Sequence, residues 1–422
     1  MTVTDVNRPS AHPAGVDAAR WPDVATAPHT PVRAAVAKRI FHRAVERIPV
    51  RVVEAGRRYG GGRAGDPEFT LVRPEAFYHR IGDTGTIGFG EAYMAGDWVS
   101  DDLAGVLTAF AGHMRELVPA ALQRLRHVVL RRTPSAEDNT IAGARRNIQR
   151  HYDLSNNLFK TFLDESMTYS SALFDGDPAG CNEELAAAQR RKVDRLLDAA
   201  GVHPGKRVLE IGTGWGELAI RAAHRGARVT SLTISREQAD LARQRIEEAG
   251  VADRATVLLR DYRQVDGSYD AVVSVEMIEA VGANHWDTYF ATIDRVLAPG
   301  GRLGLQAILQ DDETVRNTGE TYTWIRKYIF PGGQIASAEA IARVVTRATS
   351  MRISDQYRFG RHYAETLRRW RERFEARAQA VSQLGFDETF RRMWSLYLAY
   401  SEAGFRTGYL DVAQFTMSKP AC

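Results

Sequence analysis

The chain has few of the features that would place it outside the cell or across a membrane. Cys181 and Cys422 are its only cysteines, too few for a disulfide framework or a cysteine zinc site. No uninterrupted apolar run reaches the roughly 18 residues that a membrane-spanning helix needs. The N-terminal stretch MTVTDVNRPSAHPAGVDAARWPD lacks the apolar core of a secretory signal. These absences predict a protein of the reducing cytoplasm.

The length of 422 residues exceeds one ordinary domain, so two domains are expected. Residues 1–30 are rich in Pro, Ala and Asp and are predicted to be disordered. A small α/β domain is expected at 31–123, followed by a basic, polar linker at 124–147. The second domain then covers 148–422, and its last 70 residues or so read as mostly helical.

Strand-like and helical runs alternate from residue 201 onward. The strand-like runs are RVLEIGT, RVTSLTI, ATVLLRD, YDAVVSVEM and GRLGLQAIL. Alternation at this interval indicates βαβ units around a mostly parallel sheet. The predicted fold class is therefore α/β and doubly wound, with helical additions.

A glycine-rich turn follows the first of these strands, in the segment VLEIGTGWGELA at 208–219. Glycine tolerates positive φ and lets a ligand approach the backbone, so such a turn suits a nucleotide-like cofactor. The spacing is GxGxG, whereas a dinucleotide site has GxGxxG and an acid about 20 residues later. The second strand carries no acid, and Glu210 stands before the turn instead. The pattern favours a cofactor that has no pyrophosphate.

Polar side chains follow the next three strands, at the edge where ligands of parallel sheets bind. These are Thr233-Ile234-Ser235 with Gln238, then Asp261-Tyr262-Arg263, then Glu276 to Glu279. Hydroxyls and an amide suit ribose, and Tyr262 could cover an adenine ring. The constellation resembles the class I S-adenosylmethionine (SAM) methyltransferases, which release S-adenosylhomocysteine.

More specific motifs extend from about residue 145 to the end of the chain. They are HYDLSNNLFKTFLDESMTYSSALF, AAAQRRKVDRLL, RDYRQVDGSYDAVVSVEMIEAVG, WIRKYIFPGG and HYAETLRRWRERF, with a weaker match in IGFGEAYMAGDW. Together they resemble the cyclopropane-fatty-acid synthase family, closest to the actinobacterial branch that makes methyl-branched, tuberculostearic-type acids. The resemblance implies methyl transfer from SAM to a cis double bond of a phospholipid acyl chain.

The resemblance also implies two sets of site residues. The catalytic set is Glu279, Tyr363, Gln306, Ser171, Ile308 and Ser401. The SAM-binding set is Tyr169, Ser170, Glu210, Gly212, Thr213, Gly214, Trp215, Gly216, Thr233, Ile234, Ser235, Gln238, Asp261, Tyr262 and Arg263.

Several catalytic positions depart from the family pattern. Glu279 and Tyr363 match residues that help to hold a bicarbonate ion used as the base. Ser171 and Ser401 stand where relatives carry Cys, and Gln306 stands where they carry His. Ser and Gln still donate hydrogen bonds to an oxyanion, but Gln306 cannot carry a positive charge. Retention of bicarbonate is therefore an open question.

Methylation of an alkene leaves a carbocation, which water would trap. The site must align the reactants, exclude water and offer π-faces, for which Tyr169 and Tyr363 are candidates, with Glu279 as fixed negative charge. Immediate loss of a proton from the new methyl group gives a cyclopropane. A hydride shift before deprotonation gives an exocyclic methylene, and the altered positions favour this product. A separate reductase would then saturate the branch.

The predicted partner is a phospholipid membrane, at whose inner face the enzyme would associate peripherally. The formal net charge is only +4, but arginine is clustered in 34–48 and 361–377, where amphipathic helices could dock. A solvated helix face is the alternative interpretation of each run and, taken by itself, the more common one. A homodimer is expected from the family, and no metal site is proposed. Two rival hypotheses are a nucleic-acid methyltransferase and a non-catalytic SAM- or lipid-binding protein. The sequence contains no RNA-binding module and no NPPY-like motif, which argues against the first.

Overall fold

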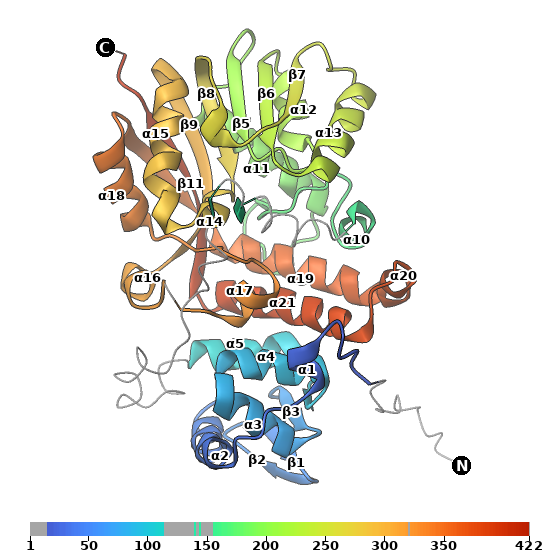
Figure 1. The fold of residues 1–422 in the computed structure, drawn as a ribbon. Coiled ribbons are helices and arrows are strands. Elements are labelled where there is room, and N and C mark those ends of the chain that lie inside the picture. Colours follow the sequence, from blue (N-terminus) through green and yellow to red (C-terminus); the bar gives the residue numbers. More distant parts are fainter. Residues whose placement is uncertain (1–14, 114–138, 141–142, 145–154, 320, 422) are drawn as a thin grey trace.

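The structure is a computed structural model that describes residues 15–113, 139–140, 143–144, 155–319 and 321–421. Two α/β domains are stacked end to end, and the long helices α19 (Gly360–Ala376) and α21 (Glu388–Arg406) lie between them (Figure 1). Most of the linker expected at 124–147 lies outside the described residues, as do residues 1–14. Within the described residues, no helix is both long and apolar enough to cross a bilayer.

The larger domain is built on a seven-stranded sheet in the order β10-β11-β9-β8-β5-β6-β7. The five strands from β5 to β9 run parallel, while β11 pairs antiparallel with both β9 and β10. The order reverses beside β5, which creates the switch point where ligands of such sheets bind. The strands are β5 (Arg207–Ile211), β6 (Arg228–Thr233), β7 (Ala255–Leu259), β8 (Tyr269–Val275), β9 (Leu297–Gln310), β10 (Arg352–Arg358) and β11 (Leu410–Ser418).

Helices cover both faces of this sheet, and the alternation of side chains along each strand explains why. In β5, Val208 packs with one helix layer, whereas Leu209 and Ile211 point to the other. All three are buried. One layer is α11 (Leu185–Ala199), α12 (Glu217–His224) and α13 (Arg236–Glu248), and the other is α14 (Ile278–Val281), α15 (Trp286–Val296) and α18 (Ala338–Ala348). The doubly wound fold expected from the sequence is confirmed.

The smaller domain has a four-stranded sheet in the order β2-β1-β3-β4, packed against helices. Its core is aromatic, with Phe69 stacked on Trp98 at 4.5 Å between ring centroids. Its elements are α1 (Pro22–Ala25), α2 (Pro31–Val45), β1 (Arg51–Glu54), β2 (Arg57–Tyr59), β3 (Glu68–Leu71), α3 (Pro74–Thr84), α4 (Thr86–Ala95), β4 (Trp98–Val99) and α5 (Leu103–Gly112).

Short helices connect the two domains. Trp324 of α17 packs against Gly90 of α4, where an added Cβ would lie 2.3 Å from the indole. Lys327 of the same helix forms an ion pair with the buried Glu91 at 2.5 Å. These contacts join the segment after β9 to the small domain. The remaining short helices are α10 (Asn156–Lys160), α16 (Asp312–Thr318), α17 (Trp324–Tyr328), α20 (Ala378–Gln383) and the 3-10 turns η2 (Tyr262–Gln264) and η3 (Ala283–His285).

Residues 15–30 are ordered, so the disorder predicted for 1–30 does not hold for this part. Val24 of α1 is buried, and the indole Nε1 of Trp21 donates to Asp387 at 2.8 Å. Composition favoured disorder because Pro, Ala and Asp dominate the segment. Burial of Val24, the hydrogen bond of Trp21 and two hydrogen bonds from Arg80 to the carbonyl oxygens of Asp23 and Val24 nevertheless hold it against the rest of the protein.

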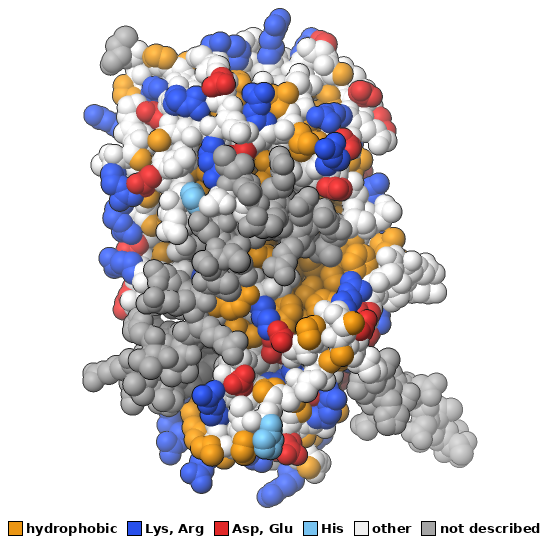
Figure 2. Space-filling view, in the orientation of Figure 1, with side chains coloured by type: hydrophobic (Ala, Val, Ile, Leu, Met, Phe, Trp, Pro, Cys, Tyr) orange, Lys and Arg blue, Asp and Glu red, His pale blue; other side chains and the backbone are white. Residues whose placement is uncertain are grey.

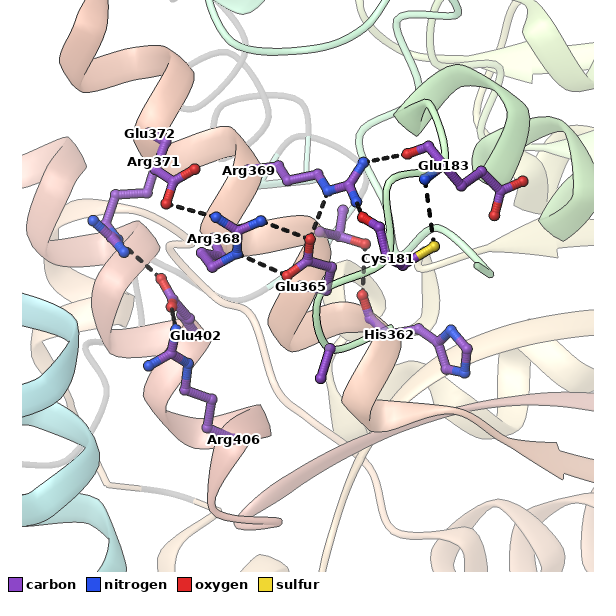
Figure 3. A network of polar contacts seen from close by, with 12 residues as sticks. Cys181, Glu183, His362, Glu365, Arg368, Arg369, Arg371, Glu372, Glu402 and Arg406 are labelled. Carbon is purple, nitrogen blue, oxygen red and sulfur yellow. Dashed lines mark hydrogen bonds and ion pairs between the residues drawn. The ribbon is translucent and has the colours of Figure 1, made fainter. Parts of the chain in front are cut away.

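The arginine-dense helix α19 is an internal element, which is the reverse of the membrane-docking interpretation of 361–377. Leu367, Trp370 and Phe374 on its apolar face are buried in the core. Arg368, Arg369 and Arg371 of this helix meet acidic or main-chain partners within the protein (Figure 3), as Arg369 does with Glu365 at 2.6 Å. Arg371 likewise pairs with the buried Glu402 of α21 at 2.9 Å. No apolar face is left on α19 to enter a bilayer.

Candidate active site

The glycine turn after β5 has the backbone that its sequence predicted. Gly212, Gly214 and Gly216 all have positive φ, which favours glycine over other residues. An added Cβ at Gly212 would lie 2.4 Å from Cγ of Met277, so the turn fits closely against the end of β8. Gly216 precedes α12, and its Cβ would lie 3.2 Å from Ala242 on the neighbouring helix α13. The last glycine therefore serves helix packing.

One pocket opens at the carboxyl ends of β5, β6 and β8 and contains most of the predicted SAM-binding residues. Gly216 and Ser235 do not line it, and Ser235 caps α13 by accepting from the N–H of Gln238 at 3.2 Å. The predicted residues that line the pocket are Tyr169, Ser170, Glu210, Gly212, Thr213, Gly214, Trp215, Thr233, Ile234, Gln238, Asp261, Tyr262 and Arg263. The described chain thus brings together the set that the sequence indicated.

The polar wall of the pocket is held in place by hydrogen bonds between strands. Ser231 on β6 donates to Glu210 on β5 at 2.5 Å, and burial raises the pKa of the Glu210 carboxyl to about 8. Thr233 donates to Gln238 at 2.9 Å, and Arg263 pairs with Asp261 at 2.7 Å. Hydroxyl, amide and carboxylate groups at this edge suit the ribose and amino acid parts of SAM.

Lys192 of α11 is a pocket residue that the sequence reasoning did not identify. Its side chain is fully buried, its Nζ donates to Ser170 at 2.6 Å, and burial lowers the pKa of its ammonium group to about 8. The nearby carboxylates of Glu276 and Glu210 oppose this shift. A lysine inside a helical motif resembles an exposed residue, so nothing in AAAQRRKVDRLL indicated its burial.

Glu276 is the centre of the predicted catalytic cluster, although the sequence reasoning gave that place to Glu279. Its Oε1 accepts from the backbone N–H of Ser171 at 3.0 Å and from Nε2 of Gln306 at 2.8 Å. Its Oε2 accepts from the hydroxyl of Tyr363 at 2.7 Å. Burial raises the pKa of the Glu276 carboxyl, and these donors, with Lys192, oppose the rise. Three donors and a lysine therefore favour a carboxylate here.

Glu279 lies near this carboxylate but has different hydrogen-bond partners. Its Oε1 accepts from the backbone N–H of Ile308 at 2.5 Å, whereas its buried Oε2 has no hydrogen-bond partner among the described residues. Burial and the negative charge of Glu276 raise the pKa of the Glu279 carboxyl to about 8. Glu276 has three hydrogen-bond donors that stabilise its charged form, whereas Glu279 has one, so Glu276 is the better placed of the two to carry the negative charge that we had expected on Glu279.

The two altered catalytic positions reach the carboxylate in different ways. Gln306 donates with its side chain, as the sequence reasoning expected, but Ser171 donates with its backbone. The hydroxyl of Ser171 turns away and donates to the carbonyl oxygen of Ala172 at 3.0 Å. Ser401, on α21, is half-buried and has no hydrogen bond to any of these groups in the described chain. Ser401 therefore stands outside the cluster.

A detectable signal for Glu276 was present in the segment SVEMIEAVG. Two acids stand three residues apart at the end of a strand that the sequence already placed at the pocket. The backbone of Glu276 has a φ of +50°, which no sequence pattern predicts for a glutamate. Among the described residues, no group of three His, Cys, Asp or Glu side chains is arranged to hold a metal.

The sheet order, the glycine turn at the switch point and the polar pocket beside it define a class I SAM-dependent methyltransferase. The crystal structure titled as mycolic acid cyclopropane synthase CmaA1 complexed with SAH and CTAB matches with a TM-score of 0.60 and 31% sequence identity. That match covers 65% of this chain and 98% of the other.

The chain belongs to the mycolic acid cyclopropane synthetase family, whose pattern matches residues 140–415. It is 52% identical to tuberculostearic acid methyltransferase UfaA1 of Mycobacterium tuberculosis, over 99% of both chains. It is 34% identical to the cyclopropane-fatty-acyl-phospholipid synthase of Escherichia coli K12, over 84% of this chain and 88% of that protein. The resemblance inferred from the motifs is therefore confirmed.

Proposed function

We propose that this enzyme methylates the cis double bond of an oleoyl-type phospholipid acyl chain and forms a methylene-branched product. The observation that carries the proposal is a pair of half-buried carboxyl groups just after β8. Glu276 lines the methyl-donor pocket and accepts from the hydroxyl of the buried Tyr363, and Glu279 follows it three residues later. The identity to a tuberculostearic acid methyltransferase supports the same substrate class.

SAM supplies an electrophilic methyl group when it is bound. The glycine turn and the residues after β6 and β7 would hold it, because they line one pocket and Gly212 leaves no room for a side chain. The chain's own contribution is alignment of the reactants, which is worth about 7–11 kcal/mol in well-oriented reactions.

The surroundings of the pocket suit a cationic hydrocarbon. Tyr169 lines the pocket, and its ring lies 5.3 Å from that of Trp370. The ring of Tyr363, which is 6% exposed, packs on Phe405 at 4.4 Å. Aromatic faces stabilise positive charge, and apolar walls exclude the water that would trap it. These features favour a carbocation pathway over methylation of a polar atom.

The product follows from when the proton leaves the new methyl group. Deprotonation after a hydride shift gives the methylene, whereas immediate deprotonation gives a cyclopropane. The departure at Gln306 places an amide donor on the Glu276 carboxylate, which supports a base position unlike that of the cyclopropane synthases. The cyclopropane remains the alternative product.

The test is incubation of the pure protein with SAM and oleoyl phospholipid, followed by mass spectrometry with ozonolysis. Ozone cleaves an exocyclic methylene and leaves a cyclopropane intact. A cleaved methylated lipid supports the proposal, and an intact one supports the cyclopropane alternative. Methyl uptake into RNA in a parallel reaction would favour a nucleic-acid methyltransferase, and uptake into neither would favour a binding protein.

Peripheral contact with the inner membrane surface is part of this proposal, and α2 is the segment that would provide it. Val32 and Val36 on this helix are 77% and 52% exposed. Arg39 and Arg43 follow on the same helix, are exposed, and form no ion pair in the described chain. Apolar side chains beside free arginines suit an anionic lipid surface. On the face shown in Figure 2, hydrophobic side chains also gather near the level of α19 and α20.

Two further partners belong to the proposal. A methylene product requires a separate reductase to yield a saturated methyl branch. A homodimer is also proposed, and light scattering of the pure protein tests it.

A further inference from the structure

We infer that Glu276 is the general base of the reaction, a resident carboxylate in the place where an external anion would otherwise bind. The inference rests on the proposed function and names the group that receives the proton. It goes beyond the sequence reasoning, in which bicarbonate was the candidate base and Glu279 was one of the residues holding it.

The hydrogen-bond donors around Glu276 are arranged as in an anion-binding site. The backbone N–H of Ser171, the amide of Gln306 and the hydroxyl of Tyr363 come from three separate parts of the chain and converge on its two oxygens. Such a set is what a small oxyanion needs in a buried site. Because the Glu276 side chain occupies this donor set, an external anion would have to displace it and would be repelled by its negative charge.

The Glu276 carboxylate also keeps a lone pair that can accept a proton. A carboxylate offers about four lone-pair sites. Among the residues that the structure describes, two donors meet Oε1, whereas only Tyr363 meets Oε2. Oε2 therefore retains an unused lone pair, and the residue lines the same pocket as Tyr169 and Gly212. This oxygen is the atom that we assign as proton acceptor.

The backbone of Glu276 adopts a left-handed conformation. Its φ of +50° is a left-handed conformation that glycine adopts freely and a glutamate adopts at a cost. The backbone N–H of Glu276 is tied to the carbonyl oxygen of Gln306 at 2.8 Å, which holds this conformation. Strained residues of this kind persist where surrounding contacts fix them, and they concentrate at functional sites. A glutamate here gains nothing for the turn itself, which points to a role for its carboxylate.

The proton balance is complete with Glu276, solvent and the two reactants. The bond between sulfur and the methyl carbon breaks as a bond forms between that carbon and one alkene carbon, which leaves the positive charge on the other alkene carbon. A hydride then moves from the methylated carbon to its neighbour. Oε2 of Glu276 takes a proton from the methyl group, whose C–H electrons form the methylene double bond. The neutral acid afterwards returns this proton to solvent.

The experiment compares Glu276→Gly with Glu276→Gln, with Glu247→Gln on the exposed face of α13 as the control. Glycine suits the positive φ, so Glu276→Gly should fold, and it leaves three donors around an empty space. Activity on oleoyl phospholipid is measured in buffers stripped of carbon dioxide, with and without added formate. Loss of a positioned base costs roughly 100- to 10,000-fold in rate.

We expect wild-type and Glu247→Gln proteins to be indifferent to formate and to removal of carbon dioxide. Glu276→Gly should lose at least about 100-fold in rate and regain about 10-fold or more with formate. Glu276→Gln should lose as much and gain nothing, because its side chain still fills the space. Three outcomes would overturn the inference. They are activity of Glu276→Gly within about 3-fold of wild type, equal stimulation of all proteins by formate, and dependence of the wild type on bicarbonate.

A binding measurement separates this inference from the proposed function. If wild type transfers no methyl group to the lipid, the proposed function fails. Nuclear magnetic resonance of ¹³C-labelled formate with the SAH-saturated proteins then decides the anion site. Binding to Glu276→Gly and not to wild type supports a resident carboxylate in an anion site, and absence of binding to Glu276→Gly overturns it.

Discussion

Gln414 on β11 donates through Nε2 to Oε1 of Gln306 on β9 at 3.0 Å, and the two residues are direct cross-strand partners. Both side chains are buried. Because Oε1 of Gln306 is engaged in this way, its NH₂ group must face Glu276. Arg195 in turn donates to Oε1 of Gln414 at 2.8 Å, which fixes the direction of the whole chain of amides. Gln414 is thus a positioning residue for the carboxylate.

Gln414→Leu should therefore lower kcat by up to about 10-fold, because the loss of one hydrogen bond between neutral groups is worth about 0.5–1.5 kcal/mol. The KM for SAM should stay within about 2-fold, since Gln414 does not line the pocket. Steady-state kinetics of Gln414→Leu beside Gln306→Leu checks this. Additive rather than overlapping losses in the double variant would show that the two amides act separately.

Tyr363→Phe removes the one hydrogen-bond donor that Oε2 of Glu276 has within the described part of the chain. A donor to the charged form lowers the pKa of a carboxyl, so its removal should raise the pKa of Glu276. A base is active when deprotonated, and the acidic limb of the pH–kcat profile should accordingly move to higher pH. The profile of wild type and variant over pH 5 to 9 measures the shift. A limb that stays in place or moves to lower pH would contradict the assignment.

Gly212→Ala should weaken SAM binding strongly. The φ at Gly212 is +99°, and an added Cβ would lie 2.4 Å from Met277. Gly250→Ala is the matched control, because its φ is +69° and nothing lies within 4 Å of an added Cβ. The control should lose about 1–2 kcal/mol of stability and keep its affinity. Isothermal titration with SAH distinguishes the two, and equal affinity in both variants would be unexpected.

Glu279→Gln should change how stability depends on pH. The folded-state pKa of Glu279 is raised to about 8 from an ordinary value of 4.5, so the folded state binds more protons than the unfolded state between these values. Its stabilising contribution is complete below pH 4.5 and declines up to about pH 8. The glutamine variant lacks this decline. Urea unfolding of both proteins at pH 5 and pH 8 should show a smaller loss for the variant.

Val36→Glu and Arg39→Glu should reduce binding to vesicles that contain anionic phospholipid. The first places a charge on the exposed apolar part of α2, and the second reverses a free positive charge. Arg228→Glu, an exposed arginine on the catalytic domain, is the control for net charge. Vesicle sedimentation at two salt concentrations measures the effect. Equal losses in all three proteins would assign binding to overall charge and not to α2.

The sequence predicted the doubly wound sheet and most of the SAM pocket because both depend on local patterns. Alternating strands and helices fix the sheet, and Gly212 and Gln238 stand at positions that strand ends define. The choice between Glu276 and Glu279 could not be made in this way. It depends on Tyr363 and Gln306, which reach the site from elements far along the chain, and on a left-handed φ at a glutamate.

The arginines and Lys192 mark the other limit of sequence reasoning. The segment 361–377 alternates apolar and charged residues as a surface helix does, yet its charges meet partners on α21 and in the loop before α11. Lys192 likewise reads as exposed. The charge of a residue alone does not reveal whether the folded protein places an oppositely charged or polar group beside it.

The left-handed turn at Glu276 has a consequence for how such enzymes can diversify. Codons for glycine and glutamate differ by one base, and glycine is the residue that this backbone would accept most readily. One mutation at this position could therefore convert a catalyst that carries its own acid–base group into one that borrows a dissolved ion, or the reverse, without rebuilding the scaffold. Dependence on ambient carbon dioxide would then be an easily gained or lost trait among otherwise similar lipid-modifying enzymes.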